Sequence, residues 1–492
     1  MKKLLFHIAQ LNLDAPVRKV IDLLLVEMNR LNGIINSWKS KYNKLKSKYG
    51  ELQAENEALK SENEDLKSKG QKNSSNSHRP PSTDGYKKKP KNNRVPSGKK
   101  QGAQEGHNGK TLEKSDHVDE VVVHEPDEEF CECGYPLKDA PVVYCNRCQC
   151  IDLPEFKFQV TEHQYLSRQC PVCGKIYKAK PTSSVYYGPR LKAFCTYFNH
   201  YQLIPFNRVQ EMVADLFGRG VSDSFLVGTN KQLAKLLSPF TVHVKEQLMD
   251  VACSHADETG ARCNNCGQWI HVVCTDRWTY YYGHSGRGKE AMEAGGILAN
   301  YHGTVVHDRF SSYDSFDFTD ALCGVHLLRD LRFLFEEKKS KWARKMYDLL
   351  LWAKDTKATG NLDYKDVSHF EKRYDLITQT ADLFVQKPEK NPPGKRGRPK
   401  RSQERRLLDA FLNRKQDILR FLHQPEVPFD NNQAERDLRM IKLQQKISGC
   451  FRKPDGRDIF CTNRSYISTL KKHKVDVLEG LALAFNGQPL FT

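Results

Sequence analysis

The sequence lacks any apolar run long enough to cross a bilayer, which takes about 20 residues. Its N-terminus has basic residues and a short apolar stretch, but Asn12 and Asp14 interrupt it, so we do not expect a secretory signal. Acidic residues are outnumbered by basic ones: 60 Asp and Glu stand against 78 Lys and Arg, a net charge of +18. These deficits predict a cytoplasmic chain without a membrane span. The basic excess favours a polyanionic partner, most commonly nucleic acid, over a merely basic protein.

Apolar residues are nearly missing from residues 70–112, where Ser, Pro, Gly, Asn and Lys dominate. Such a composition cannot bury enough apolar surface to form a core, and it predicts a disordered linker. Because the linker is basic, it either follows nucleic-acid phosphates without sequence preference or serves as a solvated spacer.

Residues 1–69 are predicted to be helical, with heptads that begin near residue 20. One apolar series repeats every seven residues from Leu24 to Leu66, and its partner series runs from Ile21 to Asn63. This period predicts a left-handed coiled coil, and Asn in the partner series favours a parallel dimer. The alternative is one amphipathic helix folded onto its own chain. We therefore expect a homodimer or a larger homo-oligomer.

Fifteen cysteines in a cytoplasmic protein indicate metal binding rather than disulfides. Residues 113–180 form a cysteine-rich β module, in which paired thiolates on tight turns suit tetrahedral Zn²⁺. The four candidate zinc ligands are Cys131 and Cys133 near its start and Cys170 and Cys173 near its end.

The stretch between the two cysteine pairs, residues 142–165, alternates enough to predict a β-hairpin. Three further cysteines lie inside it. They are alternative zinc ligands, a second partial site, or small buried residues: Cys145, Cys148 and Cys150.

Residues 181–248 are predicted to be helical and contain a helix-turn-helix candidate. Asn207 is placed to cap a first helix, Gly218-Arg-Gly220 supplies the turn, and Ser222 is placed to cap a second helix. The second helix is only modestly basic. Packing is therefore at least as good an interpretation as base reading in the major groove.

From residue 249 the pattern predicts strands. Three runs form a meander, and two more follow a predicted helix around residues 289–300. A meander followed by alternating helix and strand is the order of a ribonuclease-H-like α/β fold, in which the first and fourth strands are neighbours. The five strands are expected at residues 251–256, 269–275, 278–283, 303–307 and 321–325.

The chain is thus expected to be a multidomain α+β protein. The first part of the ribonuclease-H-like catalytic core would occupy residues 249–335. A helical insertion would follow at residues 336–429. Residues 430–492 would supply a returning helix and the C-terminal tail.

Three acidic residues fall where such a fold brings its elements together. Asp257 follows the first predicted strand, Asp308 closes the fourth, and Glu435 opens the returning helix. Each alone has an ordinary interpretation: a strand-end turn residue, a cap, and a capping box with Asn432. Together they have the arrangement that holds two Mg²⁺ ions for phosphodiester chemistry.

Several motifs resemble the insertion-sequence-66 family, bacterial transposases with a DDE-type catalytic core. The resemblance covers the chain from about residue 75 to near the C-terminus, including the linker and the cysteine pairs. It implies that Asp257, Asp308 and Glu435 are the metal-binding triad. The motifs are His-Ala-Asp257-Glu-Thr-Gly, Asp308 followed by Tyr313, Cys323-Gly-Val-His326, and Asp430-Asn-Asn-Gln-Ala-Glu435-Arg-Asp-Leu-Arg439.

The sequence departs from the family pattern in two places. His307-Asp308-Arg309 stands where the family usually has Ser-Asp before Gly, but the acid is kept. Cys263-Asn-Asn-Cys266 lies in the turn expected between the first two strands, where members usually lack cysteine. It is either an ordinary tight turn or part of a second metal site with Cys253 or Cys274.

Three residues near the triad are candidates for supporting roles. His326 is placed to contact a phosphate or to orient a carboxylate; the alternative is a packed structural histidine. Arg436 and Arg439 flank Glu435. Arg439 shares its helix face and is either a DNA-phosphate contact or the partner of a carboxylate such as Asp430.

A basic strip in the helical insertion, residues 394–401, carries the Arg-Gly-Arg-Pro core of an AT-hook. Arginines on such an extended strip fit a narrow, A·T-rich minor groove, and the alternative is a solvated basic loop. The residues assigned to DNA contact are Lys395, Arg396, Arg398, Lys400 and Arg401.

These expectations describe a DNA transposase that cleaves element ends and joins the 3′-OH ends to target DNA. Its cofactors would be two Mg²⁺ ions per site and Zn²⁺. Its partners would be double-stranded DNA, further copies of the chain and accessory proteins of the same element. The resemblance implies a bacterial, nucleoid-associated protein. Two alternatives stay open: a silenced, zinc-dependent DNA-binding regulator, and a metal-dependent nuclease that cuts without joining.

Overall fold

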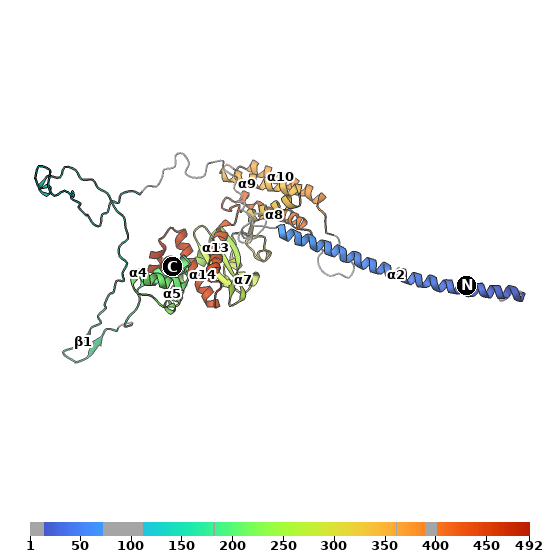
Figure 1. Ribbon diagram of the computed structural model, residues 1–492, viewed down its shortest axis with the longest axis horizontal. Coiled ribbons are helices and arrows are strands. Elements are labelled where there is room, and N and C mark those ends of the chain that lie inside the picture. The colour runs from blue at the N-terminus through green and yellow to red at the C-terminus, as the bar shows by residue number, and fades with distance from the viewer. Residues whose placement is uncertain (1–13, 72–111, 181–182, 361, 389–400) are drawn as a thin grey trace. The chain divides into compact units, whose positions relative to one another are not determined.

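Figure 1 shows the computed structural model, in which the described part of the chain is mixed α+β, with a long N-terminal helix and one larger β-sheet. The chain divides into two compact units: residues 1–91 with 332–340, and residues 92–331 with 341–492. No helix among the described residues is both long and apolar enough to span a membrane. The structure describes residues 14–71, 112–180, 183–360, 362–388 and 401–492.

The first unit contains helix α2, Ala15–Gln71, which is continuous through the predicted heptads. The apolar positions of the first heptad series are exposed; Leu24, Trp38 and Leu45 keep 62%, 69% and 69% of their surface accessible. An amphipathic helix normally buries such a stripe, and within the described residues of this unit these side chains are exposed. The long helix agrees with the heptad pattern, and its pairing with a second chain stays a prediction.

Residues 112–180 hold little regular structure. The β-hairpin predicted at residues 142–165 is not formed, because alternation alone does not hold two strands without a face to bury. The strands instead flank the Cys170 turn, where the Gly174 N–H donates to the Cys170 carbonyl at 2.9 Å. The elements are the 3₁₀-helix η2 (Leu137–Asp139) and the antiparallel pair β1 (Ser167–Gln169) and β2 (Ile176–Lys178).

The segment before the larger sheet is helical, as predicted. Gly218, with a φ of 71°, ends α4, and the Ser222 side chain caps α5 by accepting from Phe225 N at 3.2 Å. Pro205, rather than Asn207, occupies the N-cap position of α4. The elements are α3 (Pro189–Thr196), the π-helical turn η3 (Tyr197–Tyr201), α4 (Phe206–Phe217), α5 (Asp223–Leu236) and α6 (Ser238–Met249).

The larger sheet has the strand order β5-β4-β3-β6-β7. The first three strands form the predicted antiparallel meander, and β3, β6 and β7 pair in parallel, so the first and fourth strands are neighbours. The strands are β3 (Cys253–Cys263), β4 (Cys266–Cys274), β5 (Thr279–His284), β6 (Thr304–His307) and β7 (Thr319–Leu322). The connections carry α7 (Lys289–Ala294) and the 3₁₀ turns η4 (Leu298–Asn300) and η5 (Tyr313–Ser315).

Strand β3 is longer than its apolar run predicted, because pairing with β4 continues as far as Cys263 and Cys266. Asn264 and Asn265 form the two-residue connection, with φ angles of 47° and 59°, as a type I′ turn requires. The Cys-Asn-Asn-Cys motif is therefore a tight turn. In the described chain, its cysteines join no group of three or more metal-ligating side chains.

The described chain beyond β7 is helical, and helix α14 covers the edge strand β5. The Tyr281 N–H donates to Ser465 Oγ at 2.9 Å, and the Thr279 N–H donates to Thr469 Oγ1 at 3.3 Å. These hydroxyls satisfy donors that an edge strand leaves unpaired. The helices are α8 (Gly324–Glu337), α9 (Lys341–Ala358), α10 (Tyr364–Phe384), α11 (Gln403–Asn413), α12 (Lys415–His423), α13 (Asn432–Ser448), α14 (Pro454–Lys472) and α15 (Val477–Phe485).

The junction between β7 and α8 depends on a glycine. The Gly324 N–H donates to the Phe429 carbonyl at 2.8 Å, and a Cβ atom on Gly324 would overlap the Phe429 ring. Phe429 is buried and lies just before α13. Only a residue without a side chain lets these two segments approach so closely.

We expect Gly324→Ala to lower the free energy of unfolding by roughly 1–3 kcal/mol, because the added methyl group forces the ring or backbone to move. Gly228→Ala in α5 is the matched control, since its Cβ would meet open space. That control should be neutral or stabilising by up to about 1 kcal/mol. Thermal unfolding compares the two variants. Equal stability of Gly324→Ala and the parent would contradict this packing.

Candidate active site

Two of the predicted acids lie on or directly after neighbouring strands of the sheet, β3 and β6. Strands β3 and β6 pair in parallel, with His255 opposite Val306. Asp257 lies two residues further along β3, and Asp308 lies two residues beyond Val306. Residues that advance equally from a paired position stay level in parallel strands. Both carboxylates therefore lie level with each other along neighbouring strands, but Asp257 lies inside β3 and not after its end as predicted, because pairing with β4 extends the strand.

The third acid, Glu435, is brought beside these strands by the buried residue Asn431, which precedes α13. Its side-chain Nδ2 donates to the Ala256 carbonyl at 2.8 Å, and its Oδ1 lies 2.8 Å from His255 Nδ1. Its backbone N–H donates to Cys323 Sγ at 3.2 Å. One side chain thus fastens the start of α13 to β3 beside Asp257. Sequence reasoning missed this role.

Glu435 lies in the first turn of α13 but forms no capping box. The N-cap position is Asn431, which makes no side-chain cap, and the Asn432 N–H donates instead to Asp430 Oδ1 at 3.0 Å. Glu435 Oε1 is buried, accepts no hydrogen bond, and lies 3.5 Å from His326 Nε2. Because a buried acceptor without a donor is costly, this oxygen is suited to an added ligand.

The half-buried Asp257 has the least favourable electrostatic environment of the three acids. Burial raises its pKa well above the ordinary value, and the charges of Glu258, Asp308 and Glu435 raise it further. Only the Glu258 N–H, which donates to Asp257 Oδ1 at 2.8 Å, opposes these effects. Such a cluster of acids is destabilising unless a proton or a cation neutralises it.

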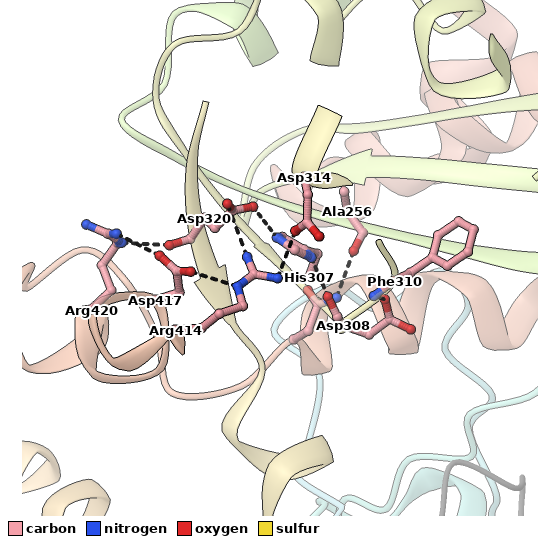
Figure 2. Close-up of polar contacts among 10 residues, drawn as sticks. Ala256, His307, Asp308, Phe310, Asp314, Asp320, Arg414, Asp417 and Arg420 are labelled. Atoms are coloured by element: carbon pink, nitrogen blue, oxygen red, sulfur yellow. Dashed lines mark hydrogen bonds and ion pairs between the residues drawn. The ribbon is translucent and has the colours of Figure 1, made fainter. Parts of the chain in front are cut away.

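The turn after β6 is held by a chain of ion pairs (Figure 2). His307 Nε2 lies 2.8 Å from Asp320 Oδ1 on β7, and Arg414 Nη2 lies 3.1 Å from Asp320 Oδ2. Arg414 also pairs with Asp417 at 2.8 Å. Burial by itself raises the pKa of Asp320, but His307, Arg414 and Arg420 hold it below its ordinary value. The next residue after His307 is Asp308, so these contacts fix the backbone that carries the second acid.

A second cluster beside Asp308 was also missed by sequence reasoning. The buried Glu258 carboxylate accepts from Arg287 Nε at 2.7 Å and from the Tyr313 hydroxyl at 2.8 Å. Arg287 Nη2 lies 3.8 Å from Asp308 Oδ2, and the guanidinium stacks 3.9 Å from the Phe310 ring centre. Arg287 is thus a pre-positioned, partly exposed cation that can bind a phosphate oxygen.

Some signals for this cluster were present in the sequence. Glu258 follows Asp257 within one motif, and Tyr313 belongs to the motif that begins at Asp308. Arg287 lies in the connection after β5, where nothing in the sequence distinguishes it from other surface arginines. Only the folded chain identifies it.

The remaining predicted residues near the triad lie in different settings. His326 Nε2 lies beside Glu435, and these two residues and Cys323 place their ligand atoms within 4.8 Å of one another. Burial raises the pKa of the Cys323 thiol to about 12. Arg436 and Arg439 are both exposed, and Arg436 Nη2 donates to Gln433 Oε1 at 2.9 Å.

The four predicted zinc ligands form two separate pairs. Hydrogen bonds from the Tyr135 backbone and from Cys131 lower the pKa of Cys133. Backbone hydrogen bonds from Cys173 and Val172, and the Cys173 thiol, lower the pKa of Cys170. Within the described residues, the two pairs do not converge into one group of three or more ligands. Each turn favours a thiolate, and a shared zinc ion stays a prediction.

Most of the predicted AT-hook lies outside the described residues, including Lys395, Arg396, Arg398 and Lys400. Arg401 is described, and its Nη1 pairs with Asp409 Oδ2 at 2.9 Å. The role of the strip in binding DNA stays a prediction.

Asp257 should make the metal-free protein less stable as pH rises. A folded-state pKa above the unfolded value means that the protonated carboxyl contributes stability at acidic pH, which is lost as pH rises through the folded pKa. Asp257→Asn should therefore raise the free energy of unfolding in EDTA above that pH by roughly 1–3 kcal/mol. The gain should vanish in acid.

Chemical denaturation across a pH series measures this effect. Asp276→Asn, at an exposed position, is the control and should shift stability little at any pH. A constant difference between Asp257→Asn and the parent across the series would contradict the assigned charge cluster.

Comparisons with known proteins identify the family of this chain. A model of the transposase IS66 family matches residues 184–458, more than half of the chain. A model of a family of unknown function (DUF6444) matches residues 21–113. No curated protein matches the sequence. The matched region contains the sheet, the three acids and helix α13, and on this match the chain belongs to the IS66 family of transposases.

Proposed function

We propose that this transposase is a DDE-type enzyme that cleaves the ends of its element and joins the 3′-OH ends to target DNA, with Asp257, Asp308 and Glu435 as its metal-binding triad. One observation supports the proposal: three carboxylates that are far apart in the sequence interact electrostatically where β3, β6 and α13 come together. Family membership supplies the transposase role. The catalytic assignment rests on this geometry.

The sheet supports a ribonuclease-H-like core for this chemistry. A three-strand antiparallel meander extended by two parallel strands, in the order β5-β4-β3-β6-β7, is the arrangement expected for that fold. It puts the first acid on the central strand and the second at the end of its neighbour. The helical insertion of α9 to α12 then separates them in sequence from Glu435.

The three carboxylates of the proposed triad suit Mg²⁺ as a ligand set. Carboxylate oxygens are the hard ligands that Mg²⁺ prefers. Asp257 is half-buried among like charges, and Glu435 Oε1 is buried without a hydrogen bond, so a cation would stabilise both carboxylates. When bound, a pair of such ions activates the attacking oxygen and stabilises the leaving oxygen of a phosphodiester.

The protein's own groups would position the DNA. Arg287 is held by Glu258 and stacks on Phe310, so little side-chain freedom is lost when it binds a backbone phosphate. Tyr313 locks the other oxygen of Glu258. The hydrogen bond between His307 and Asp320 would keep the Asp308 turn in place. These contacts support a catalytic role over DNA binding alone.

Further DNA contacts and cofactors complete the proposal. The net charge of +18 suits a double-stranded DNA partner, both element ends and target. The residues proposed to bind DNA outside the core are those of the AT-hook-like strip together with Arg436 and Arg439. Zn²⁺ would join the two cysteine pairs of residues 113–180 into one module.

Cleavage of DNA that carries the element's own terminal repeats tests the triad. In Mg²⁺ the protein should nick at the repeat end, and EDTA should stop it. Glu435→Gln should reduce the rate by more than the roughly 10–100-fold typical of an outer-shell partner, because a direct ligand is lost. Glu479→Gln, which alters another first-turn helix glutamate, is the matched control and should cut normally.

Arg287→Ala should weaken binding of the repeat DNA. Its affinity should also fall less steeply with rising salt concentration than that of the parent, because one phosphate contact is gone. An assay with pre-cut element ends then distinguishes joining from cutting: strand transfer supports a transposase, whereas nicking alone supports a nuclease. Tight DNA binding without nicking in any divalent metal would contradict the catalytic assignment.

The exposed heptad face of α2 is proposed to pair with a second copy of the chain. Leu31 and Leu45 lie on this face and are exposed, and the helix is long enough to bury a continuous seam. Changing both to Glu should raise the dimer dissociation constant by at least about tenfold, since charges would enter the seam. Sedimentation measures this change.

Ser40→Glu with Ser47→Glu provides the control, because those positions lie outside both heptad series. The control should sediment like the parent. A parent chain that is monomeric at every concentration, or equal effects of the two double variants, would rule out this seam.

A further inference from the structure

Beside the carboxylate edge lies a group of side chains with a different chemistry. Cys323 ends the connection from β7, His326 lies in the first turn of α8, and Glu435 lies in the first turn of α13. Their ligand atoms, one sulfur, one nitrogen and one oxygen, all lie within 4.8 Å of one another. In the described part of the chain, this is the group of three such ligands that converges on one point.

We propose that Cys323, His326 and Glu435 form a binding site for a transition-metal ion of the Zn²⁺ class, and that its occupancy withdraws Glu435 from the proposed catalytic site. The second half of this proposal rests on the function proposed above. The first half, metal binding, does not.

The spacing fits zinc. In a tetrahedral site, bonds of about 2.3 Å to sulfur and about 2.1 Å to nitrogen or oxygen put two ligand atoms roughly 3.4–3.6 Å apart. His326 Nε2 and Glu435 Oε1 already lie 3.5 Å apart, and the Cys323 sulfur would have to approach them by at most about 1.2 Å. Three protein ligands leave a fourth tetrahedral position for water or another group.

The ligand types select the ion. A thiolate and an imidazole favour Zn²⁺, Co²⁺ or related ions, whereas Mg²⁺ takes oxygen ligands and would use Glu435 without the other two. The Cys323 sulfur already accepts the Asn431 N–H at 3.2 Å, which orients it. Glu435 Oε1 is buried and has no hydrogen-bond donor to lose.

Glu435 is shared by the proposed zinc site and the proposed magnesium site, so the two metals would compete for it. Glu435 is the single member of the triad that lies in both sets of ligands. A zinc ion held by Cys323 and His326 would engage this carboxylate and leave Asp257 and Asp308 without their third partner. Zinc should therefore inhibit at a fixed magnesium concentration, by competition for one side chain.

Cobalt titration of the full-length, metal-free, reduced protein tests the binding. A thiolate bound to Co²⁺ gives a charge-transfer absorption band. The absorbance of this band should be higher in the parent than in Cys323→Ser, and the difference should correspond to one bound thiolate. His326→Gln should keep the band but weaken cobalt affinity by about tenfold or more. Zn²⁺ should displace the cobalt.

Two controls separate this site from the rest of the protein. Cys195→Ala removes another buried cysteine outside the group and should leave the spectrum unchanged. Because the cysteine pairs of residues 113–180 are present in every variant, their absorption cancels in the difference. Circular dichroism checks that each variant is folded, and His326→Gln provides a second arm if Cys323→Ser does not fold.

Asp308→Asn distinguishes this proposal from the proposed function. It should abolish magnesium-dependent nicking yet bind cobalt like the parent. Zinc should inhibit nicking by the parent at lower concentration than nicking by Cys323→Ser. Identical cobalt spectra and affinities for the parent, Cys323→Ser and His326→Gln would overturn the site, whether or not the protein cuts DNA.

Discussion

The candidate active site depends on one buried amide. Asn431 donates to the Ala256 carbonyl and contacts His255, both on β3, while its backbone reaches Cys323 at the end of β7. Without this bridge, nothing in the sequence obliges a helix that starts after a long insertion to begin beside β3. A fully satisfied buried polar contact of this kind specifies one arrangement among many that would bury similar apolar area.

The rest of the core supports a local arrangement that is unfavourable by itself. Asp257 is half-buried beside three other acids, which raises the free energy of its charged form. The cost is tolerated because β3 is central in the sheet and α14 covers the far edge strand. Proteins commonly keep such unfavourable charge clusters where a ligand relieves them. The cation that relieves Asp257 would also organise the chemistry.

Glu435 links two kinds of metal chemistry. On one side are the hard carboxylates of Asp257 and Asp308, and on the other are the sulfur of Cys323 and the imidazole of His326. An ion's preference for oxygen or for sulfur and nitrogen decides which set it selects. A single carboxylate therefore makes the site responsive to the identity of the metal as well as to its concentration.

Local patterns determined much of this protein: the long heptad helix, the strand meander, the helical segments, and the neighbouring strands that position Asp257 and Asp308. They did not determine the end of β3, the absence of a hairpin at residues 142–165, or the cluster of Glu258 and Arg287. Periodicity reports which side chains face a core, and this information is local. Strand pairing, buried amide contacts and ion pairs between distant segments form only when the chain is closed, so tertiary structure alone decided them.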